Sequence, residues 1–285
     1  MSAVLRIFPS PTRNPGALAE IAGVVPGSRL EVRPRPVTIP IGIPQVDELT
    51  GGVPRGGLTE IFGPASSGRT SLLLALVAQM TAREEVCALV DASDAFDPHS
   101  AAAAGVDLER VLWVRCGSNP PQKNQKNRVI GSSRHREIDF QMTQCPDHPI
   151  TRSSVEQALR ALDLLLQAGG FGLLVIDLGD IPPGIARRVP LASWFRFRRA
   201  VENTDTALVV VEQEASAKSC ASLVLKTQHL AVSTQHLART GTSPTHARLL
   251  SGLQLEVEVL NSRIWQRKPV RSATTLFESR ASWVG

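Results

Sequence analysis

The sequence predicts an α/β fold in which a mostly parallel β-sheet carries helices on both faces. Short apolar segments that fit buried strands alternate along the chain with segments of helical period. Two of these strands, Val86–Val90 and Phe171–Ile176, are continuously apolar and run directly into an aspartate. Continuous apolar strands are typical of parallel sheets that are covered on both sides, because neither face of such a strand meets water.

The strand Leu58–Phe62 leads into the loop around which the rest of the chain is organised. Gly63–Thr70 has the spacing of a phosphate-binding P-loop, except that Arg69 stands where the motif has lysine. Gly63 and Gly68 allow backbone angles that bring successive N–H groups around one anion. The following helix, Thr70–Ala82, points its positive end at the same place, and the Thr70 hydroxyl suits Mg²⁺. The alternative is an ordinary glycine-serine turn that binds no nucleotide.

A polar arm precedes the predicted core. Met1–Pro36 is rich in Pro, Arg and Gly and contains one short helical segment, Ala17–Ala22. The core is predicted over residues 37–285, with a polar insertion at 117–152 that is expected to be a loop without regular structure. The arm is either flexible or an element that docks on another subunit through Leu18 and Ile21.

The remaining elements follow from periodicity and from helix-ending glycines and prolines. An edge strand and a short helix come before the P-loop strand, and helices and strands alternate after it. In chain order these are Val37–Ile43, Gln45–Leu49, Pro98–Gly105, Val111–Val114, Ser153–Ala168, Ile185–Asn203, Ala207–Val211 and Leu253–Val259.

Length, charge and cysteine content limit the classes of protein to which the chain can belong. The chain has 285 residues and is 42% hydrophobic, enough for one large core, and its net charge of +5 is compatible with an anionic partner. Four cysteines show no paired spacing, and Cys87 and Cys116 lie in apolar runs as expected for buried thiols. Cys145 and His148 are too few for a metal site. No apolar stretch reaches the ~18 residues of a membrane span, so a cytoplasmic protein is predicted.

Asp177 is the second candidate site residue. A carboxylate at the carboxyl end of a buried strand can hold the water shell of Mg²⁺ opposite a P-loop. A strand that ends in an aspartate is common by itself. When it follows a P-loop in a chain whose strands and helices alternate, it favours a Mg²⁺ site.

Two basic segments are candidates for single-stranded DNA binding. Ile185–Asn203 interleaves five arginines with Trp194, Phe195 and Phe197, and the insertion carries further Lys and Arg residues. The alternative is that the arginines form a solvated helix face, the aromatic residues belong to the core, and the insertion is a solvated loop.

Three segments resemble the RecA-type recombinase ATPases. They are the P-loop with its lead-in from Gly42, the strand and turn Cys87–Pro98, and the segment Ala161–Asp177. The resemblance implies a RecA-like P-loop NTPase core with ATP and Mg²⁺ as cofactors, the metal being held through the nucleotide by Thr70 and Asp177. It also implies the following nucleotide-binding residues: Gly63, Pro64, Ala65, Ser66, Ser67, Gly68, Arg69, Thr70, Ser71, Asp177, Gln213 and Arg263.

The chain departs from this family at functional positions. Ser93 stands where the family has its catalytic glutamate, Arg69 replaces the P-loop lysine, and Arg263 matches one of two basic residues that reach a neighbouring subunit's nucleotide. No catalytic residue is therefore assigned. Such altered chains resemble the ImuA-type accessory proteins of SOS-induced translesion synthesis.

The residues leave three functions open. The first is a DNA-damage-response accessory factor with weak or no ATP hydrolysis, and the second is an active DNA-dependent ATPase and recombinase. The third is an interaction module that binds no nucleotide. The implied partners are single-stranded DNA, a RecA-like filament, an ImuB-like or polymerase partner, and further copies of the chain.

Overall fold

The computed structural model describes residues 36–117, 149–230, 252–262 and 273–280. The chain divides into two compact units, residues 1–35 and 36–285. The predicted arm, most of the predicted insertion, Cys145, His148 and Arg263 lie outside the described residues.

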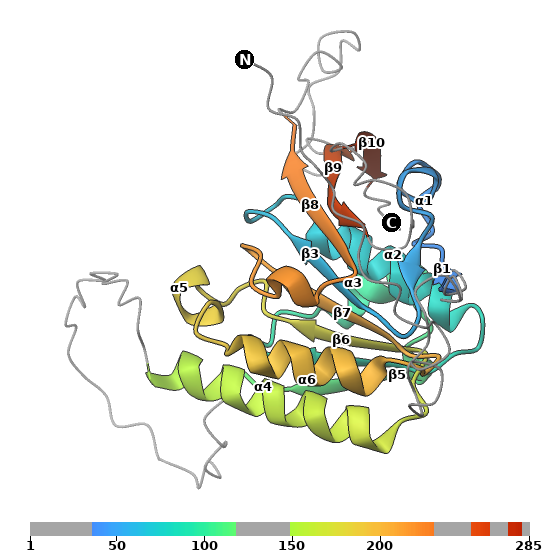
Figure 1. Ribbon diagram of the computed structural model, residues 1–285. Helices are drawn as coiled ribbons and strands as arrows, with labels where there is room; N and C mark the ends of the chain where they lie inside the picture. The colour runs from blue at the N-terminus through green and yellow to red at the C-terminus, as the bar shows by residue number, and fades with distance from the viewer. Residues whose placement is uncertain (1–35, 118–148, 231–251, 263–272, 281–285) are drawn as a thin grey trace, which may run out of the picture. The chain divides into compact units, whose positions relative to one another are not determined.

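Within the described residues, eight strands form one mixed sheet (Figure 1). Their spatial order is β10 (Ala273–Arg280), β9 (Gly252–Ser262), β8 (Leu223–His229), β3 (Leu58–Phe62), β7 (Ala207–Glu212), β6 (Leu173–Asp177), β4 (Cys87–Asp91) and β5 (Val111–Arg115). The strands from β8 to β5 are parallel to their neighbours, whereas β9 pairs antiparallel with β8 and β10 pairs antiparallel with β9. The predicted mostly parallel sheet is confirmed.

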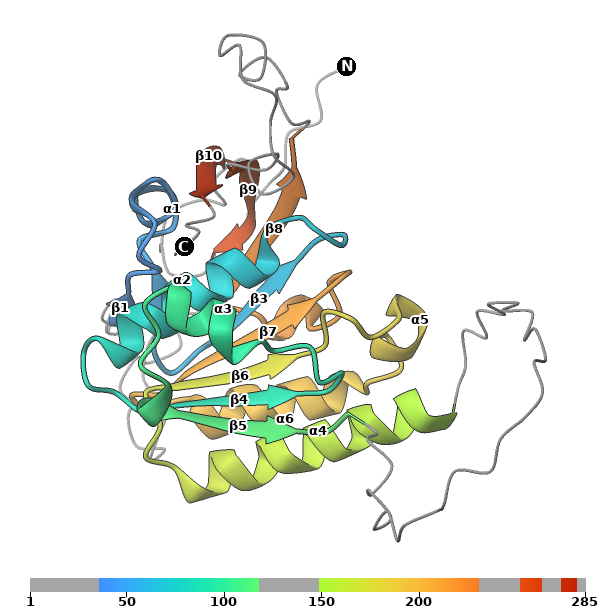
Figure 2. The ribbon, with the colours of Figure 1, turned by 180° about the vertical axis from the view of Figure 1, so that it is seen from behind.

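Helices cover both faces of the sheet, as predicted (Figures 1 and 2). On one face, α1 (Pro44–Thr50), α2 (Arg69–Thr81) and α3 (Pro98–Ala103) pack with Leu89, Val175 and Val209. On the other, α4 (Pro149–Ala168), α5 (Pro183–Ala186) and α6 (Leu191–Val201) pack with Val90, Ile176 and Val210. Successive residues of each strand thus enter opposite cores, which explains why these strands are continuously apolar.

The predicted strand Val37–Ile43 is wrong in extent. Within this range only Thr38–Ile39 (β1) forms a strand, and it pairs with β2 (Val53–Pro54) in a separate two-stranded sheet. Pro40 cannot donate a ladder hydrogen bond, and Pro44 begins α1 at a position where proline is favoured.

The predicted helix Ile185–Asn203 is two helices, α5 and α6. Pro190 precedes α6 as its N-cap, and its fixed backbone separates the two. Helix α4 begins at Pro149, four residues before the predicted Ser153, so Pro149–Arg152 belongs to this helix and not to the insertion. Strands β8 and β10 and the short 3₁₀ helices Leu108–Arg110 and Lys218–Cys220 were not predicted.

Cys87 and Cys116 are buried, as predicted, and Cys220 is buried as well. Burial raises the pKa of the Cys87 thiol to about 12, so this thiol is un-ionised and inert near neutral pH. Among the helices of the described residues, none is long and apolar enough to cross a membrane.

Candidate functional site

Four neighbouring parallel strands end at the same edge of the sheet. At this edge, Phe62 of β3 is aligned with Glu212 of β7. Asp177 of β6 is aligned with Val211 of β7 on one side and with Asp91 of β4 on the other. The loop that follows β3 therefore lies beside the ends of β6 and β4. In open α/β sheets, ligands bind at the carboxyl ends of the strands, so the candidate site residues gather where such sites form.

The glycines of the loop are required by close packing on β8 and β9. A Cβ atom at Gly63 would lie 2.2 Å from the Thr227 carbonyl oxygen. Gly68 has φ of +90°, and a Cβ there would lie 2.4 Å from Cδ1 of Leu255. Larger residues at either position would displace the loop, because ordinary Cβ contacts are longer than these distances.

The loop contains backbone donors that are not used within the described structure. The N–H groups of Ala65, Ser66 and Gly68 make no hydrogen bond to a described residue, and Pro64, Ala65 and Ser66 are exposed. These donors lie just before α2, a helix of 13 residues, whose N-terminus carries partial positive charge. The loop thus fits an anion such as a phosphate group.

Ser67 offers fewer free donors to an anion than its place in the P-loop motif suggests. Its side chain is buried, and its Oγ shares a 2.7 Å hydrogen bond with Thr227 Oγ1 on β8. Its N–H donates to the Pro64 carbonyl oxygen over 3.3 Å. Both groups stabilise the loop itself.

Arg69, the first residue of α2, extends to the loop that follows β6. Its Nη1 donates a 3.0 Å hydrogen bond to the Gly179 carbonyl, and the residue is only 7% exposed. Burial lowers the pKa of the guanidinium, while Asp177 and Asp180 act in the opposite direction. An arginine nevertheless keeps its charge at neutral pH.

Asp177 is a partly buried carboxylate at the end of β6. Its Oδ1 accepts a 2.8 Å hydrogen bond from the Gly179 N–H. Burial raises the pKa of Asp177 to about 6, an effect reinforced by Asp91 and Asp180 and opposed by the Gly179 hydrogen bond and Arg69. The carboxylate is therefore ionised only above mildly acidic pH.

A small cavity joins these groups. It has a volume of about 170 Å³, and its lining includes Arg69, Thr70, Asp177 and Asp180. Ligand pockets commonly measure roughly 300–1,000 Å³, so this cavity holds only part of a nucleotide. Within the described residues, no group of three or more His, Cys, Asp or Glu side chains could bind a metal ion unaided.

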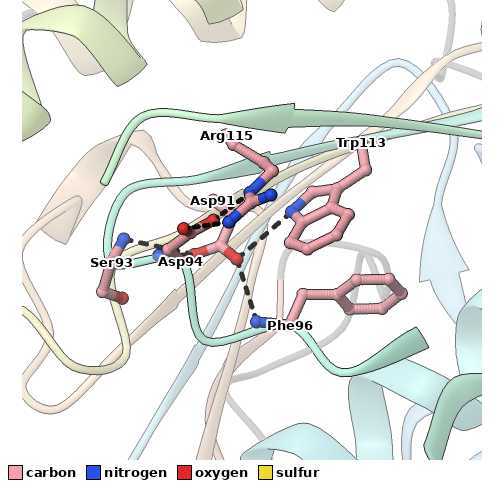
Figure 3. A network of polar contacts seen from close by, with 6 residues as sticks. All are labelled: Asp91, Ser93, Asp94, Phe96, Trp113 and Arg115. Carbon is pink, nitrogen blue, oxygen red and sulfur yellow. Dashed lines mark hydrogen bonds and ion pairs between the residues drawn. The ribbon is translucent and has the colours of Figure 1, made fainter. Parts of the chain in front are cut away.

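Asp91 fixes the loop in which Ser93 lies (Figure 3). Its Oδ1 accepts hydrogen bonds from the N–H groups of Ser93 (3.2 Å) and Asp94 (2.8 Å). Its Oδ2 accepts from the Phe96 N–H (2.9 Å) and from Trp113 Nε1 (3.2 Å). Ser93 is therefore held by its backbone, while its Oγ is buried and has no partner among the described residues.

Arg115 on β5 supports the same loop from outside. It pairs with both carboxylate oxygens of Asp94 and lies over the Trp113 ring, 4.7 Å from its centre (Figure 3). The hydrogen bond from Arg115 lowers the pKa of Asp94. Trp113 in turn meets Phe96 edge-to-face with ring centres 5.3 Å apart. These contacts support the loop that carries Ser93.

Sequence reasoning missed a pair of buried glutamates beside the loop. Glu60 on β3 and Glu212 on β7 are both inaccessible to solvent. Glu60 Oε1 accepts from the N–H groups of Ser216 and Ala217, each over 2.7 Å, and Glu212 accepts from the N–H and the hydroxyl of Ser216. Burial, and then the neighbouring Glu60, raise the pKa of Glu212 to about 9. An acidic residue inside an otherwise apolar strand was the signal available in the sequence.

The remaining candidate residues are placed as follows. Thr70 is exposed at the cavity, and Gln213 is partly buried with its Nε2 3.4 Å from the Ile181 carbonyl oxygen, a long contact. Trp194 and Phe197 are fully buried, so they belong to the core and cannot stack on DNA bases. Arg263 cannot be placed, because it lies outside the described residues.

Comparisons with known proteins bear on this arrangement. The family model of the RecA N-terminal domain matches residues 38–132, which include the P-loop and Ser93. Protein RecA of Deinococcus radiodurans is 29% identical over 177 residues, 57% of this chain and 39% of that protein. Protein RecA of Mesorhizobium japonicum is 29% identical over 192 residues, 62% of this chain and 43% of that protein. The comparisons support a RecA-like family.

The chain has the α/β sheet and the loop of a P-loop NTPase core, as predicted. Its match spans about two fifths of the length of these curated relatives.

Proposed function

We propose that this RecA-like chain binds ATP and serves as a DNA-repair accessory factor of the ImuA type, with weak or no hydrolysis. The observation that carries the proposal is the set of free N–H groups of Ala65, Ser66 and Gly68 at the start of α2. Three such donors and a helix N-terminus together favour a phosphate over a neutral ligand.

The phosphates would lie on Gly63–Thr70, with Thr70 and Asp177 as the residues that would hold Mg²⁺. The 170 Å³ cavity takes only part of the ligand. We infer that a second copy of the chain completes the site, as the resemblance to RecA-type ATPases implies, with Arg263 reaching across from the neighbour. Gln213 and Ser71 would complete the contacts within one chain.

Weak hydrolysis follows from Ser93. A serine hydroxyl is not a base near neutral pH and cannot replace a carboxylate in orienting and deprotonating water. The chain would then act through its nucleotide-bound state and its partners in the SOS response, namely a RecA-like filament or an ImuB-like or polymerase subunit.

The carboxylate variant Ala65→Asp tests the nucleotide site. Ala65 is exposed, so the added carboxylate disturbs no packing but places negative charge beside the free N–H groups. ATP affinity, measured by calorimetric titration, is expected to fall at least about tenfold, since a 1.4 kcal/mol repulsion suffices. This substitution is cleaner than one at Gly68, where any Cβ meets Leu255.

Ala192→Asp is the matched control, because Ala192 is exposed near the start of α6 and outside the residues that line the cavity. Unchanged ATP affinity in Ala65→Asp would contradict the proposed site. Absence of ATP binding by the wild-type protein would favour the interaction module that binds no nucleotide. Rapid, DNA-stimulated turnover would favour the active recombinase.

We propose that single-stranded DNA binds through two arginines of α6, Arg198, which is half-buried, and Arg199, which is exposed. Arg198 and Arg199 make no ion pair with a described residue, whereas Arg187 pairs with Glu214 and Arg196 with Asp163. Phe195, 46% exposed, is the aromatic residue of this segment that can reach a base.

We expect the affinity for an oligonucleotide to fall as salt rises, because phosphate contacts release counterions. Replacing Arg198 and Arg199 by alanine should reduce the slope of log K against log salt by about 0.7 for each phosphate that is no longer neutralised. Arg110→Ala, in the 3₁₀ helix that precedes β5, is the control. Affinity that does not respond to salt would exclude a phosphate-contact mechanism.

A further inference from the structure

A second, larger cavity lies at the amino ends of the parallel strands, the edge of the sheet opposite to the P-loop. This amino-edge cavity has a volume of about 530 Å³, within the roughly 300–1,000 Å³ of ligand pockets. Val86 and Gly172, which directly precede β4 and β6, line it together with the last residues of α4 and α6. The two helices run side by side and end at this edge (Figures 1 and 2). The described residues that line it all differ from those that line the cavity at Thr70.

Part of the wall of the amino-edge cavity is apolar. Leu165, Leu166 and Phe171 are only partly buried, and Val86 is 41% exposed. The turn Gly169–Gly170 after α4 leaves open space, because a Cβ atom at either glycine would meet nothing within 4 Å. The cavity therefore offers apolar surface that the side chains of a ligand can cover, and such burial is favourable.

The charged groups that line the amino-edge cavity are mainly acidic, although the whole chain has a net charge of +5. They are Arg55 and the carboxylates of Glu84, Glu85 and Asp205. Arg55 is already paired, since its Nη2 donates to Glu85 Oε1 (2.5 Å) and its Nη1 to the Asp205 carbonyl oxygen (2.6 Å). The carboxylates of Glu84 and Asp205 are exposed and form no ion pair with a described residue.

Two helix C-termini add partial negative charge to the same cavity. Helix α4 has 20 residues and α6 has 11, and the C-terminus of a helix is its negative end. The carbonyl oxygens of Leu166 and Ala200 accept no hydrogen bond from a described residue, and both residues line the cavity. Arg198 and Arg199, which are proposed to contact DNA, do not line it. The free acceptors and the two exposed carboxylates thus suit a cationic donor.

We propose that the amino-edge cavity is a docking site for a partner protein, which inserts a peptide segment with an arginine or lysine beside apolar side chains. The cation would lie near Glu84 and Asp205, while the apolar side chains would cover Val86 and Phe171. A nucleic acid is a poor occupant, because its phosphates would meet the same carboxylates. The site does not depend on ATP binding and so goes beyond the proposed function.

The first test compares three capped tripeptides in ligand-observed NMR titrations of the wild-type protein. Acetyl-Leu-Arg-Leu-amide is the probe, acetyl-Leu-Glu-Leu-amide reverses its charge, and acetyl-Gly-Arg-Gly-amide removes its apolar side chains. The probe is expected to bind at least about fivefold more tightly than either of the others, since one loses the charge attraction and the other the apolar contact. Equal affinities, or no binding of the probe, would overturn the proposal.

The second test blocks the cavity. Ala200 is an exposed residue of α6 that lines it, so Ala200→Phe is expected to fill part of the space and to weaken binding of the probe at least about tenfold. Ala192→Phe is the matched control, because Ala192 is an exposed α6 residue outside the lining. Thermal midpoints of both variants show that they fold. Unchanged affinity in a folded Ala200→Phe variant would place the peptide elsewhere and overturn the docking site.

The third test removes charge but little volume. The double variant Glu84→Gln, Asp205→Asn is expected to bind the probe at least about fivefold more weakly, because two exposed carboxylates near the cation become neutral. Unchanged affinity would contradict a cationic occupant, and displacement of the probe by a single-stranded oligonucleotide would assign the cavity to DNA instead. These results are independent of the ATP titrations of Ala65→Asp, since Ala65 does not line the amino-edge cavity.

Discussion

The double variant Ser93→Glu, Arg69→Lys is expected to hydrolyse ATP about 10²-fold faster than the wild-type protein. A positioned general base typically contributes about 10²–10⁴-fold to a rate, and Ser93 supplies none. The loop that carries Ser93 is already held by four hydrogen bonds to Asp91, so a longer side chain would start from a fixed backbone. The Oγ of Ser93 has no described partner, so its removal breaks no hydrogen bond within the described residues.

The measurement is steady-state phosphate release with and without single-stranded DNA. Ser93→Gln in the same Arg69→Lys background has nearly the same size as the glutamate but cannot accept a proton from water. A rate in the glutamine variant equal to that of the glutamate variant would contradict a base at position 93. Wild-type turnover already comparable to that of active recombinases would reject the idea that hydrolysis is weak.

The sequence was informative where one physical rule dominates. Strands β4 and β6 were found because both faces of the sheet are covered, so each strand is a continuous apolar run. The loop between β3 and α2 and the carboxylate at the end of β6 could be located because the spacing of the loop and the position of a strand-end carboxylate are local patterns.

The sequence failed where the environment is set by distant residues. Strand β8 contains Lys226, Thr227 and Gln228, and Thr227 is buried because it bonds the P-loop residue Ser67. The direction of Arg69 depends on Gly179, 110 residues further along the chain. The pairing of Glu60 with Glu212 likewise depends on the neighbourhood of β3 and β7, which no local pattern encodes.

The buried pair Glu60 and Glu212 is expected to make the free energy of unfolding depend strongly on pH. Glu212 has an ordinary pKa of 4.5, which burial and Glu60 raise to about 9 in the folded protein. Below pH 4.5 the group is protonated in both states, and its contribution is fully present. As pH rises, the unfolded chain loses this proton first, so the contribution to the free energy of unfolding falls until about pH 9.

The expected loss of stability between pH 5 and pH 8 is on the order of a few kcal/mol, since the unfolded chain releases a proton that the folded protein keeps. Glu212→Gln should flatten this dependence, because glutamine is neutral at every pH and its amide is able to donate a hydrogen bond to Glu60 Oε2, which has no partner among the described residues. The measurement is urea unfolding at several pH values, with the exposed Glu48→Gln as the matched control. Parallel losses of stability in wild type and Glu212→Gln would show that the pair does not hold a proton. A flattened curve would mean that the protonated pair joins β3, β7 and the turn at Ser216 next to the loop Gly63–Thr70.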